Sequence, residues 1–463
     1  MTEALTPAPV KAVAQKRGRL PFGFAPRFFL ALGIGLIWLV PVWWSPRFVA
    51  LLLIWDALVF TAWFWDLSRL PLPSKLHVRR EWTGPLILAR STNAVVEFQQ
   101  AGQSPLQVFA TDELSPALYD SVPQFELTLP SAGQVRHEYF VVPRRRGDTQ
   151  LGSLFFRYRS SFAFAERWAV APLQQTVCVL PDTTEANQQA LYLIRSRQID
   201  MQKRRRRQPG LGREFESLRD YRFGDDVRDI CWSATARRHG LVTRTFEAER
   251  SQTLWVVIDS GRLLRAEVAQ PEQTFRLSKL DYSVNAALSL AQVASQYGDR
   301  VGAIGYGRTI QQAIGAGRGP EQVRRWIDAL AHLRAEATEA NHALAARALL
   351  QKQTRRALVV WITDFAETPT IPDVVEYATQ IARRHLVLFA AVSQPDLAAA
   401  AHQVPETEAE MFRGAAALAL LQRRELLIRG LRQQGVLAME VAPGRLTTSL
   451  VNEYLSIKDR SLL

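Results

Sequence analysis

The segment GREFESLRDYRFGDDVRDICWSATARRHG, residues 212–240, concentrates acidic and basic side chains around few apolar residues. Adjacent carboxylates such as Asp225 and Asp226 can serve as a general acid and base or as metal ligands. Alternating arginines and aspartates can also pair with one another in a fixed geometry, because guanidinium and carboxylate groups form two parallel hydrogen bonds. The segment is therefore open to four interpretations: catalysis, metal binding, nucleic-acid binding and the joining of two domains.

Motifs of the common enzyme classes do not accompany this segment in the sequence. The chain has no GxxxxGK[ST] phosphate-binding loop, no GxSxG turn and no HExxH or similar spacing among its seven histidines. The two cysteines, Cys178 and Cys231, are far apart and outside any CxxC pair, so neither a disulfide framework nor a zinc site is predicted. These patterns favour a protein that is not an enzyme and that needs no cofactor.

Two apolar runs near the N-terminus, Phe28–Trp44 and Phe48–Trp65, each approach the length of a bilayer-spanning helix, which is about 20 residues. Only residues 45–47 separate the runs, which leaves room for a tight turn and little else. We predict a two-helix transmembrane hairpin over residues 28–66, with a buried hairpin of a soluble core as the alternative. Asp56 lies within the second run, where a charge is costly and often functional, and its role in the membrane stays open.

Basic residues on both sides of the hairpin predict its orientation. A basic tail, residues 1–27, precedes the hairpin, whereas the loop carries only Arg47. Because lysine and arginine are in excess on cytoplasmic flanks, we expect both termini and the soluble domains in the cytoplasm, on an inner membrane. Part of the formal net charge of +13 reflects this excess, which suits an anionic inner leaflet. The flanking residues are Lys11, Lys16, Arg17, Arg19, Arg27, Arg69, Lys75, Arg79 and Arg80.

Residues 73–182 contain short stretches with β-branched and aromatic residues at alternate positions, separated by Gly, Pro, Asp and Ser. This pattern predicts an antiparallel, β-sandwich-like domain. Residues 183–250 then contain an expected helix, a basic loop and the charged segment. We expect the loop to be solvated, with lipid headgroups or an acidic partner as alternatives, and its lack of interleaved aromatic residues disfavours nucleic acid. The basic loop consists of Lys203, Arg204, Arg205, Arg206 and Arg207.

Continuous apolar runs alternate with amphipathic helices in residues 251–463, which predicts a doubly wound, mostly parallel sheet. The segment TIQQAIGAG, just after Gly307, is expected to pair with the preceding strand as a hairpin. Ligands of such sheets bind at the carboxyl ends of the strands, where Asp259 and Asp364 lie. The predicted strands are Leu254–Ser260, Val301–Gly307, Arg356–Phe365, His385–Ser393 and Val436–Pro443.

This α/β arrangement resembles the von Willebrand factor type A domain. The resemblance implies a Mg²⁺ site made by a first-strand Asp-x-Ser-x-Ser motif, a loop threonine and an aspartate after the central strand. Here the motif reads Asp259-Ser260-Gly261-Arg262-Leu263, so both motif serines are missing. Thr338 and Asp364 complete only part of the ligand shell, and we expect weak or no Mg²⁺ binding. Asp259 is then expected to cap the next segment or to pair with Arg262.

The charged segment resembles the signature of the "domain of unknown function 58" family. The order of membrane hairpin, β-rich segment, signature and type A domain is also similar to that family, so the resemblance covers nearly the whole chain. Ser233 departs slightly from the pattern, because a basic residue commonly follows the tryptophan. The matching positions are Gly212, Glu214, Phe215, Leu218, Arg219, Tyr221, Gly224, Asp225, Arg228, Ile230, Trp232, Ala236 and Arg237.

We interpret the signature as a structural clamp between the β-rich segment and the type A sheet. Exposed ion pairs contribute only about 0–1 kcal/mol each, so a dense set of them orients two surfaces more than it stabilises them. A partner-docking surface is the main alternative and a catalytic site is the other. In the clamp, the expected apolar anchor consists of Phe215, Leu218, Ile230 and Trp232.

The family resemblance implies a membrane-anchored adaptor or assembly factor. It also implies a MoxR-type AAA+ ATPase as partner, which would supply the hydrolysis, together with a client protein or complex. An envelope- or polysaccharide-related enzyme that uses Asp225 and Asp226 is the first alternative function. A membrane-tethered nucleic-acid binder that uses the basic loop is the second.

Overall fold

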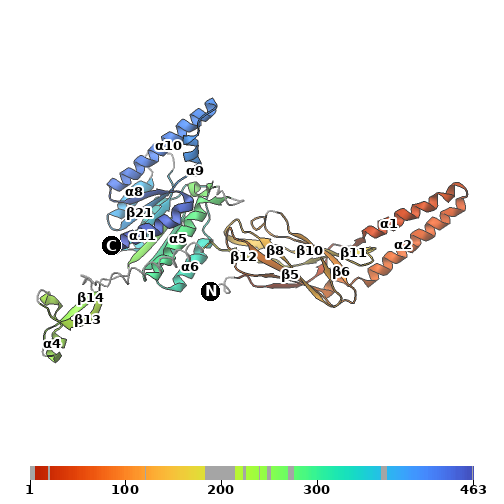
Figure 1. Cartoon of the computed structure of the whole chain (residues 1–463), viewed down its shortest axis with the longest axis horizontal. Helices are drawn as coiled ribbons and strands as arrows, with labels where there is room; N and C mark the ends of the chain where they lie inside the picture. Colours follow the sequence, from red (N-terminus) through yellow and green to blue (C-terminus); the bar gives the residue numbers. More distant parts are fainter. Residues whose placement is uncertain are drawn as a thin grey trace. The chain divides into compact units, whose positions relative to one another are not determined.

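The computed structural model describes residues 6–18, 21–119, 121–182, 214–222, 226–238, 240–247, 252–268, 276–365, 373–460 and 462. The chain divides into two compact units, residues 1–182 and 183–463, which are described separately here (Figure 1). Three signature residues, Gly212, Gly224 and Asp225, lie outside the described residues, and so does the basic loop 203–207.

The apolar N-terminal runs form helices in the first unit. Helix α1 covers Pro26–Gly35, short 3₁₀ segments follow it, and α2 covers Val49–Arg69. One helical segment, Pro46–Lys75, is long and apolar enough to cross a membrane, and the apolar helix before it is shorter. The two helices lie against each other, since the indole Nε1 of Trp55 donates to the carbonyl oxygen of Ala31 at 2.9 Å (Figure 1).

The residues before α1 belong to the β domain of the first unit. Three short strands, β1 (Val10–Val13), β2 (Gln15–Lys16) and β3 (Phe22–Phe24), precede the helix. Strand β1 pairs with β4 (Leu76–Trp82), while β2 and β3 pair with β11 (Ala165–Ala171). Residues 1–27 are therefore more than the basic tail that the sequence predicted. Their backbone groups complete the edges of two sheets whose other strands come after the helices.

The β domain consists mainly of two antiparallel sheets around a shared core. One sheet has the order β1-β4-β5-β8 and the other β2-β11-β10-β6-β7. Side chains alternate between buried and accessible positions along most of these strands, so one face of each sheet contacts the core. The remaining bounds are β5 Thr92–Gln100, β6 Leu106–Asp112, β7 Gln124–Leu129, β8 Gln134–Val141 and β10 Leu154–Ser160.

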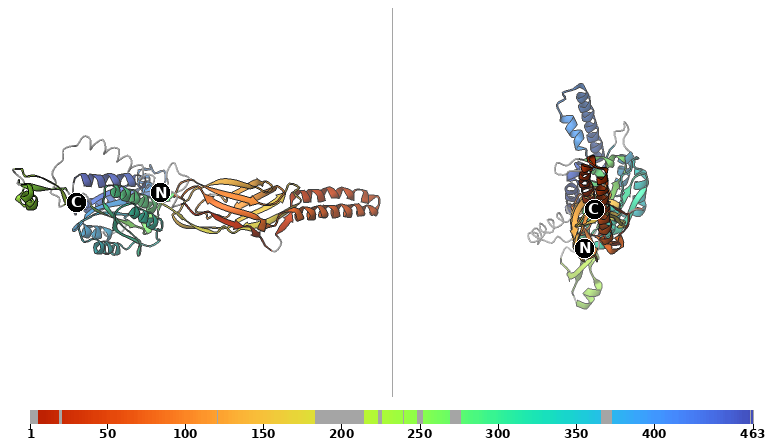
Figure 2. Two further views of the ribbon diagram at one scale, coloured as in Figure 1. Left: turned by 90° about the horizontal axis from the view of Figure 1, so that it is seen from below. Right: turned by 90° about the vertical axis from the view of Figure 1, so that its right-hand side faces the viewer.

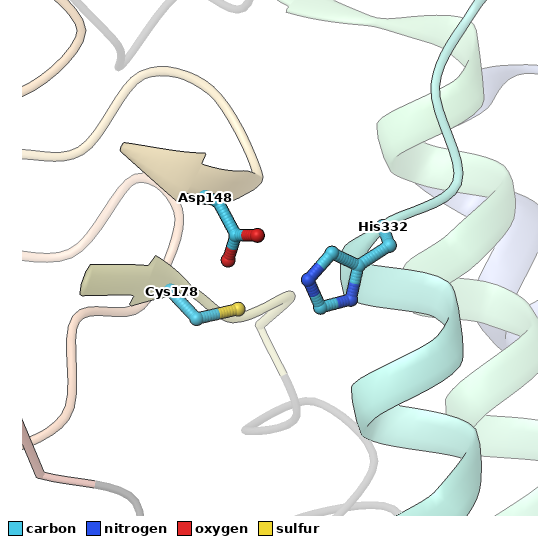
Figure 3. Close-up of side chains that lie close together, drawn as sticks. All are labelled: Asp148, Cys178 and His332. Carbon is cyan, nitrogen blue, oxygen red and sulfur yellow. The ribbon is translucent and has the colours of Figure 1, made fainter. Parts of the chain in front are cut away.

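A small ladder of two strands, β9 (Gly147–Leu151) and β12 (Gln175–Val179), adds to this domain. Cys178 on β12 pairs across the ladder with Asp148 on β9, and Figure 3 shows these two side chains next to each other. Cys178 and Cys231, which both lie in described parts of the chain, form no disulfide.

A mostly parallel sheet forms the centre of the second unit, as the sequence predicted. Its strand order is β19-β18-β15-β20-β21-β22. Strand β19 (Ile310–Gly317) runs antiparallel to β18, which confirms the expected hairpin, and the other neighbouring strands are parallel. These strands are β15 Thr253–Asp259, β18 Arg300–Tyr306, β20 Leu358–Thr363, β21 Leu386–Val392 and β22 Leu437–Val441.

Helices cover both faces of this sheet (Figures 1 and 2). One face packs against α7 (His342–Lys352), α8 (Asp373–Ala382) and α10 (Glu408–Gln433), whose apolar residues share a core cluster with Trp255 and Trp361. On the opposite face, α5 contacts β15 and β18 of the sheet and also the helices α6 and α11, and α9 lies beside α10. Their bounds are α5 Lys279–Gln296, α6 Pro320–Ala331, α9 Pro395–His402 and α11 Leu446–Asp459.

The family signature forms a small substructure of its own. Strands β13 (Glu214–Asp220) and β14 (Val242–Glu247) pair as an antiparallel ladder with a bulge. A 3₁₀ turn, Val227–Asp229, and the short helix α4 (Trp232–Arg238) lie between these strands in the sequence. Asp226 begins the turn by accepting the backbone N–H of Arg228 at 3.0 Å.

Candidate functional site

The carboxyl edge of the parallel sheet holds Asp259 at the end of β15, as expected. Oδ1 of Asp259 accepts the backbone N–H of Gly261 at 2.7 Å, and Oδ2 accepts the hydroxyl of Thr363 at 2.6 Å. A Cβ atom at position 261 would lie only 2.8 Å from the backbone nitrogen of Ala340, so glycine permits the close approach of that loop. Asp259 therefore caps the segment that follows its strand, which is one of the two roles predicted for it.

Asp364, just after β20, is bound by two cationic side chains. Nζ of Lys279, the first residue of α5, lies 2.7 Å from Oδ2, and Nη1 of Arg424 on α10 lies 2.7 Å from Oδ1. The backbone N–H of Phe365 also donates to Oδ1. Arg424 makes a second ion pair through Nε, 2.6 Å from Glu440 on β22. Lys279 and Asp364 are both buried, so the two charges neutralise each other away from water.

The residues present do not fit a divalent cation. Mg²⁺ needs several oxygen ligands in a nearly octahedral arrangement. The hydroxyl of Ser260 instead donates to the carbonyl oxygen of Tyr306 at 2.8 Å, and the hydroxyl of Thr338 lies 3.3 Å from Glu336. The Thr338 loop does reach the strand end, where its carbonyl accepts the N–H of Arg262, but its hydroxyl is exposed. The ammonium of Lys279 provides the positive charge beside Asp364.

Burial controls the charge of Asp259. Loss of solvation raises the pKa of its carboxyl to about 6, and the nearby charge of Asp364 acts in the same direction. The hydrogen bonds from Thr363 and Gly261 act in the opposite direction, because they favour the ionised form. The backbone N–H of Gly261 and the hydroxyl of Thr363, which donate to Asp259, are both neutral, whereas the ammonium of Lys279 bonds to Asp364.

A second polar group lies below this edge of the sheet. The indole Nε1 of Trp361 donates to the hydroxyl oxygen of Tyr306 at 2.8 Å, and that hydroxyl lies 2.8 Å from Nδ1 of His342. The Tyr306 hydroxyl accepts one bond, so it can donate its own proton only if Nδ1 of His342 is unprotonated. Burial lowers the pKa of His342 to about 4, although Asp373 and Glu339 oppose the shift. The imidazole is therefore neutral at pH 7, and in the tautomer that carries its proton on Nε2 the Nδ1 atom accepts the Tyr306 hydroxyl.

The sequence did not identify Lys279 or Arg424 as site residues. The two lie more than one hundred positions apart, on different helices, and each resembles an ordinary surface charge of an amphipathic helix. One signal was available for Lys279. It lies directly beside Leu280 at the start of a helix in which most residues are buried, and a buried lysine needs a carboxylate partner.

The family signature exposes residues that were expected to be buried. Trp232 is 64% exposed and Leu218 is also exposed, whereas Ile230 is only 6% exposed. Hydrogen bonds from Tyr221 N–H to the Leu241 carbonyl and from Cys231 N–H to the Val242 carbonyl join the two sides of the substructure. Trp232, the first residue of α4, therefore contributes little to the core of the substructure itself, and its role as an apolar anchor of the clamp stays a prediction.

Three charged residues of the signature segment also lie at the surface. Arg228 and Arg237 are exposed, and Asp226 is exposed while it caps the 3₁₀ turn. Arg219 on β13 donates to the carbonyl oxygen of its neighbour Asp220 at 3.3 Å. Glu214 begins the same strand opposite Glu247. Among the described residues, the signature therefore presents an aromatic ring and guanidinium groups to solvent.

A groove of about 870 Å³ lies on the solvent face of the second β sheet in the first unit. The guanidinium of Arg157 lies 4.9 Å from the ring centre of Phe109, and that of Arg17 lies 4.7 Å from Phe155. Trp168 pairs with Arg157 across β11 and β10 and donates from Nε1 to Glu166 at 2.8 Å. The groove combines aromatic surface with guanidinium groups, and its two carboxylates belong to Glu126 and Glu166.

Comparison with known proteins identifies a family for part of the chain. The model of "Protein of unknown function DUF58" matches residues 217–404, which confirms the predicted family resemblance over those residues. Uncharacterized proteins of Mycobacterium bovis and Mycobacterium tuberculosis are each 31% identical over 159 residues, which is 34% of this chain and 48% of each relative. The chain thus matches about half the length of these curated relatives.

Solved structures give weaker similarities. The conserved hypothetical protein BatB from Bacteroides thetaiotaomicron aligns with 45% of this chain and 100% of its own, at 14% identity and a TM-score of 0.30. Proximal thread matrix protein 1 from the mussel byssus aligns with 44% of this chain and 46% of its own, at 8% identity and a TM-score of 0.27.

Proposed function

We propose that this protein is a membrane-anchored adaptor or assembly factor that works with a MoxR-type AAA+ ATPase on a client protein or complex. The observation that carries this proposal is the exposed signature, in which Trp232, Arg228 and Arg237 face solvent. Tryptophan and arginine are the residues most enriched at the energetic centres of protein interfaces. We therefore favour partner docking over the interdomain clamp as the role of the signature.

The sheet edge supports a binding function more than a catalytic one. An enzyme would need carboxylates that converge on an open pocket, and Asp259 and Asp364 are instead buried and bonded within the protein. A type A domain whose cation is replaced by Lys279 keeps its loops in place without metal. Such a domain can present its surface to a partner at any Mg²⁺ concentration.

The strand pairing supports a two-helix transmembrane hairpin. Strands β1 to β3 precede the helices, their partners β4 and β11 follow them, and all belong to one unit. A chain that crossed the bilayer once would place these partners on opposite sides. From Pro26 to Trp43 the helical segments advance roughly 1.5–2.0 Å per residue, which gives about 30 Å, the thickness of the hydrocarbon core. The flanking basic residues support a cytoplasmic location for both soluble units.

Affinity purification from solubilised native membranes tests this function. Tagged full-length protein should retain a MoxR-type ATPase, with more retained in the presence of a non-hydrolysable ATP analogue. The double variant Trp232→Ser/Arg237→Gln should lose at least about tenfold in recovered ATPase, which corresponds to roughly 1.4 kcal/mol. Phe140→Ser is the matched control, because Phe140 on β8 is an exposed aromatic residue outside the signature. Equal recovery with both variants would refute docking through the signature.

A further inference from the structure

Helices α1 and α2 meet the β domain at one end of the first unit (Figure 1), and aromatic side chains contact one another at this junction. The rings of Phe24 and Phe28 have centroids 4.3 Å apart, and Phe24 and Trp63 are 4.9 Å apart. Phe60 on α2 extends the group, 5.3 Å from Phe28. Two of these rings, Phe24 and Phe60, remain exposed, so contacts within the protein cover the cluster only in part.

The turn between β10 and β11 adds another aromatic ring at this level. Phe162 in that turn is 53% exposed, and its ring centroid lies 5.6 Å from that of Trp65 on α2 in an edge-to-face arrangement. The two residues are almost one hundred positions apart in sequence. A loop of the soluble domain therefore shares one aromatic belt with the end of the candidate membrane helix.

Asp66 fixes the position of this turn. Its Oδ1 accepts the hydroxyl of Ser160 at 2.5 Å, and its Oδ2 accepts the backbone N–H groups of Phe164 at 3.0 Å and Ala165 at 2.9 Å. Asp66 itself is buried in the last turns of α2. Three hydrogen bonds to one carboxylate hold the turn, and with it Phe162, against the helix end.

Two arginines lie at the same level as the aromatic belt. Nη1 of Arg27, at the start of α1, donates to the carbonyl oxygens of Ser161 and Phe162, both at 3.1 Å. The guanidinium of Arg69, at the end of α2, lies 3.9 Å from the ring centre of Trp65. Aromatic belts flanked by arginine are typical of the boundary between hydrocarbon and headgroups, where guanidinium groups can meet lipid phosphates.

We propose that the β10–β11 turn is a membrane-interface element, with Phe162 inserted at headgroup level beside Trp65 and with Arg27 and Arg69 bound to anionic lipid phosphates. The proposal rests on the membrane anchoring given above. A lipid surface is favoured over a protein partner because the exposed rings adjoin the apolar helical segment Pro46–Lys75, whose most apolar stretch is only 6% buried inside the protein. The belt carries positive charge, which is complementary to an anionic leaflet.

Such an element adds a third point of contact to the two helices. Two helices alone leave the β domain free to tilt relative to the bilayer. A turn that enters the headgroup region beside the helices would hold the β domain at one angle to the bilayer. The β domain would then keep one orientation on the membrane, because the hydrogen bonds of Asp66 fix the turn to α2.

Depth-dependent fluorescence quenching tests the proposal. The full chain with Cys178→Ser and Cys231→Ser receives one new cysteine, labelled with a nitrobenzoxadiazole dye and placed in vesicles of phosphatidylcholine and phosphatidylglycerol. Phe162→Cys should give blue-shifted emission that headgroup spin labels quench more than labels deep in the acyl chains. Leu58→Cys, 60% exposed in the middle of α2, should show the opposite preference. Phe140→Cys, 71% exposed on β8, should be quenched by neither.

The positions distinguish failure of this inference from failure of the anchoring. If position 58 is quenched by deep labels and position 162 behaves like position 140, the turn lies in water and the inference is overturned. If position 58 is not quenched, the membrane anchoring fails and the inference fails with it. Headgroup quenching at position 162 together with deep quenching at position 58 supports both.

The role of the arginines has a separate readout. Quenching at position 162 should fall at least twofold when phosphatidylglycerol is omitted. The double variant Arg27→Gln/Arg69→Gln should show this reduced quenching in vesicles both with and without phosphatidylglycerol. Arg79→Gln on β4 should behave like the parent protein. Equal quenching with and without phosphatidylglycerol in the parent protein would overturn the anionic-lipid contact.

Discussion

Nζ of Lys279 lies 2.7 Å from Oδ2 of Asp364, and both side chains are buried at the carboxyl edge of the parallel sheet. The pair joins the start of α5 to the end of β20, and Arg424 adds α10 to the same carboxylate. The edge is thus held together by side chains from three elements. A lysine that is covalently part of the chain keeps this arrangement under conditions that would remove a metal ion.

Lys279→Met should destabilise the second unit strongly. Removal of one partner of a buried ion pair leaves the other charge without compensation, which typically costs about 3–5 kcal/mol. Arg424 still neutralises part of the charge, so the lower end is expected. Urea unfolding of the full chain in detergent measures the loss. Arg262→Gln, which breaks the exposed pair with Glu339, should cost less than about 1 kcal/mol and serves as the control.

Asp259→Asn should be at least as stable as the parent at pH 7 and indifferent to Mg²⁺ or EDTA. The folded-state pKa of Asp259 is raised from 3.8 to about 6, so the folded protein binds this proton more tightly than the unfolded chain. The contribution of Asp259 to stability therefore falls as pH rises from about 4 to about 6, by on the order of 2–3 kcal/mol. Melting temperatures of variant and parent across pH 4–8 should diverge in that window. Destabilisation of the parent by EDTA would contradict this prediction.

His342 should act in the opposite direction over a similar range of pH. Its pKa is lowered from 6.5 to about 4, so the unfolded chain binds more protons between these values. Its contribution to stability is present above about pH 6.5 and is lost as pH falls to about 4, by on the order of 3 kcal/mol. His342→Gln keeps an acceptor for Tyr306 without titrating, so this variant should lose less stability than the parent on acidification. An identical acid response would show that the imidazole does not titrate.

Trp232→Ser should leave the fold of the signature intact. Its ring is largely exposed, and surface substitutions usually change stability by no more than about 0.5 kcal/mol. Ile230→Ala is the matched core variant and should weaken the substructure by about 2–5 kcal/mol, because Ile230 is buried. Hydrogen exchange of the Tyr221 and Cys231 amides, which bond to Leu241 and Val242, reports the difference. Faster exchange in Trp232→Ser would restore the interpretation of Trp232 as an internal anchor.

Asp66→Ala should loosen the β10–β11 turn. The change removes the acceptor of the Phe164 and Ala165 amides, and hydrogen bonds to a charged group contribute about 1.5–3 kcal/mol. Exchange at these two amides should therefore accelerate by about tenfold to one hundredfold. Ser68→Ala, which removes an exposed hydroxyl bonded to the carbonyl of Trp65 one turn away, is the control. Unchanged exchange would mean that the turn is held by its own backbone.

The parallel sheet could be predicted because its strands are continuous apolar runs. The prediction of Leu254–Ser260 differs from β15 by only one residue at each end, and the hairpin after Gly307 is present as β19. Strands β1 to β3 were missed because they are two to four residues long and lie among basic residues, without a recognisable alternation. Strands β1 to β3 form because the later strands β4 and β11 provide their hydrogen-bonding partners.

The candidate site was predicted only in part for a related reason. Asp259 and Asp364 end apolar strands, so their position at the sheet edge follows from local pattern. Lys279 and Arg424 reach that edge through helix packing, which no local pattern specifies. The exposure of Trp232 was also unpredictable, because a tryptophan among charged residues is equally consistent with a buried anchor and with an exposed contact.

The pairing of β3 with β11 also sets an order of events during synthesis. Phe24 lies opposite Ala165, about 140 residues later in the chain. At about 5–20 residues per second, a ribosome needs roughly 7–30 s to deliver that partner. During this interval both helical segments and β4, the partner of β1, emerge, while β2 and β3 have no strand to pair with. In the proposed membrane hairpin, the sandwich can close only if the nascent chain returns to the side from which it left, so completion of these sheet edges would depend on insertion of both helices.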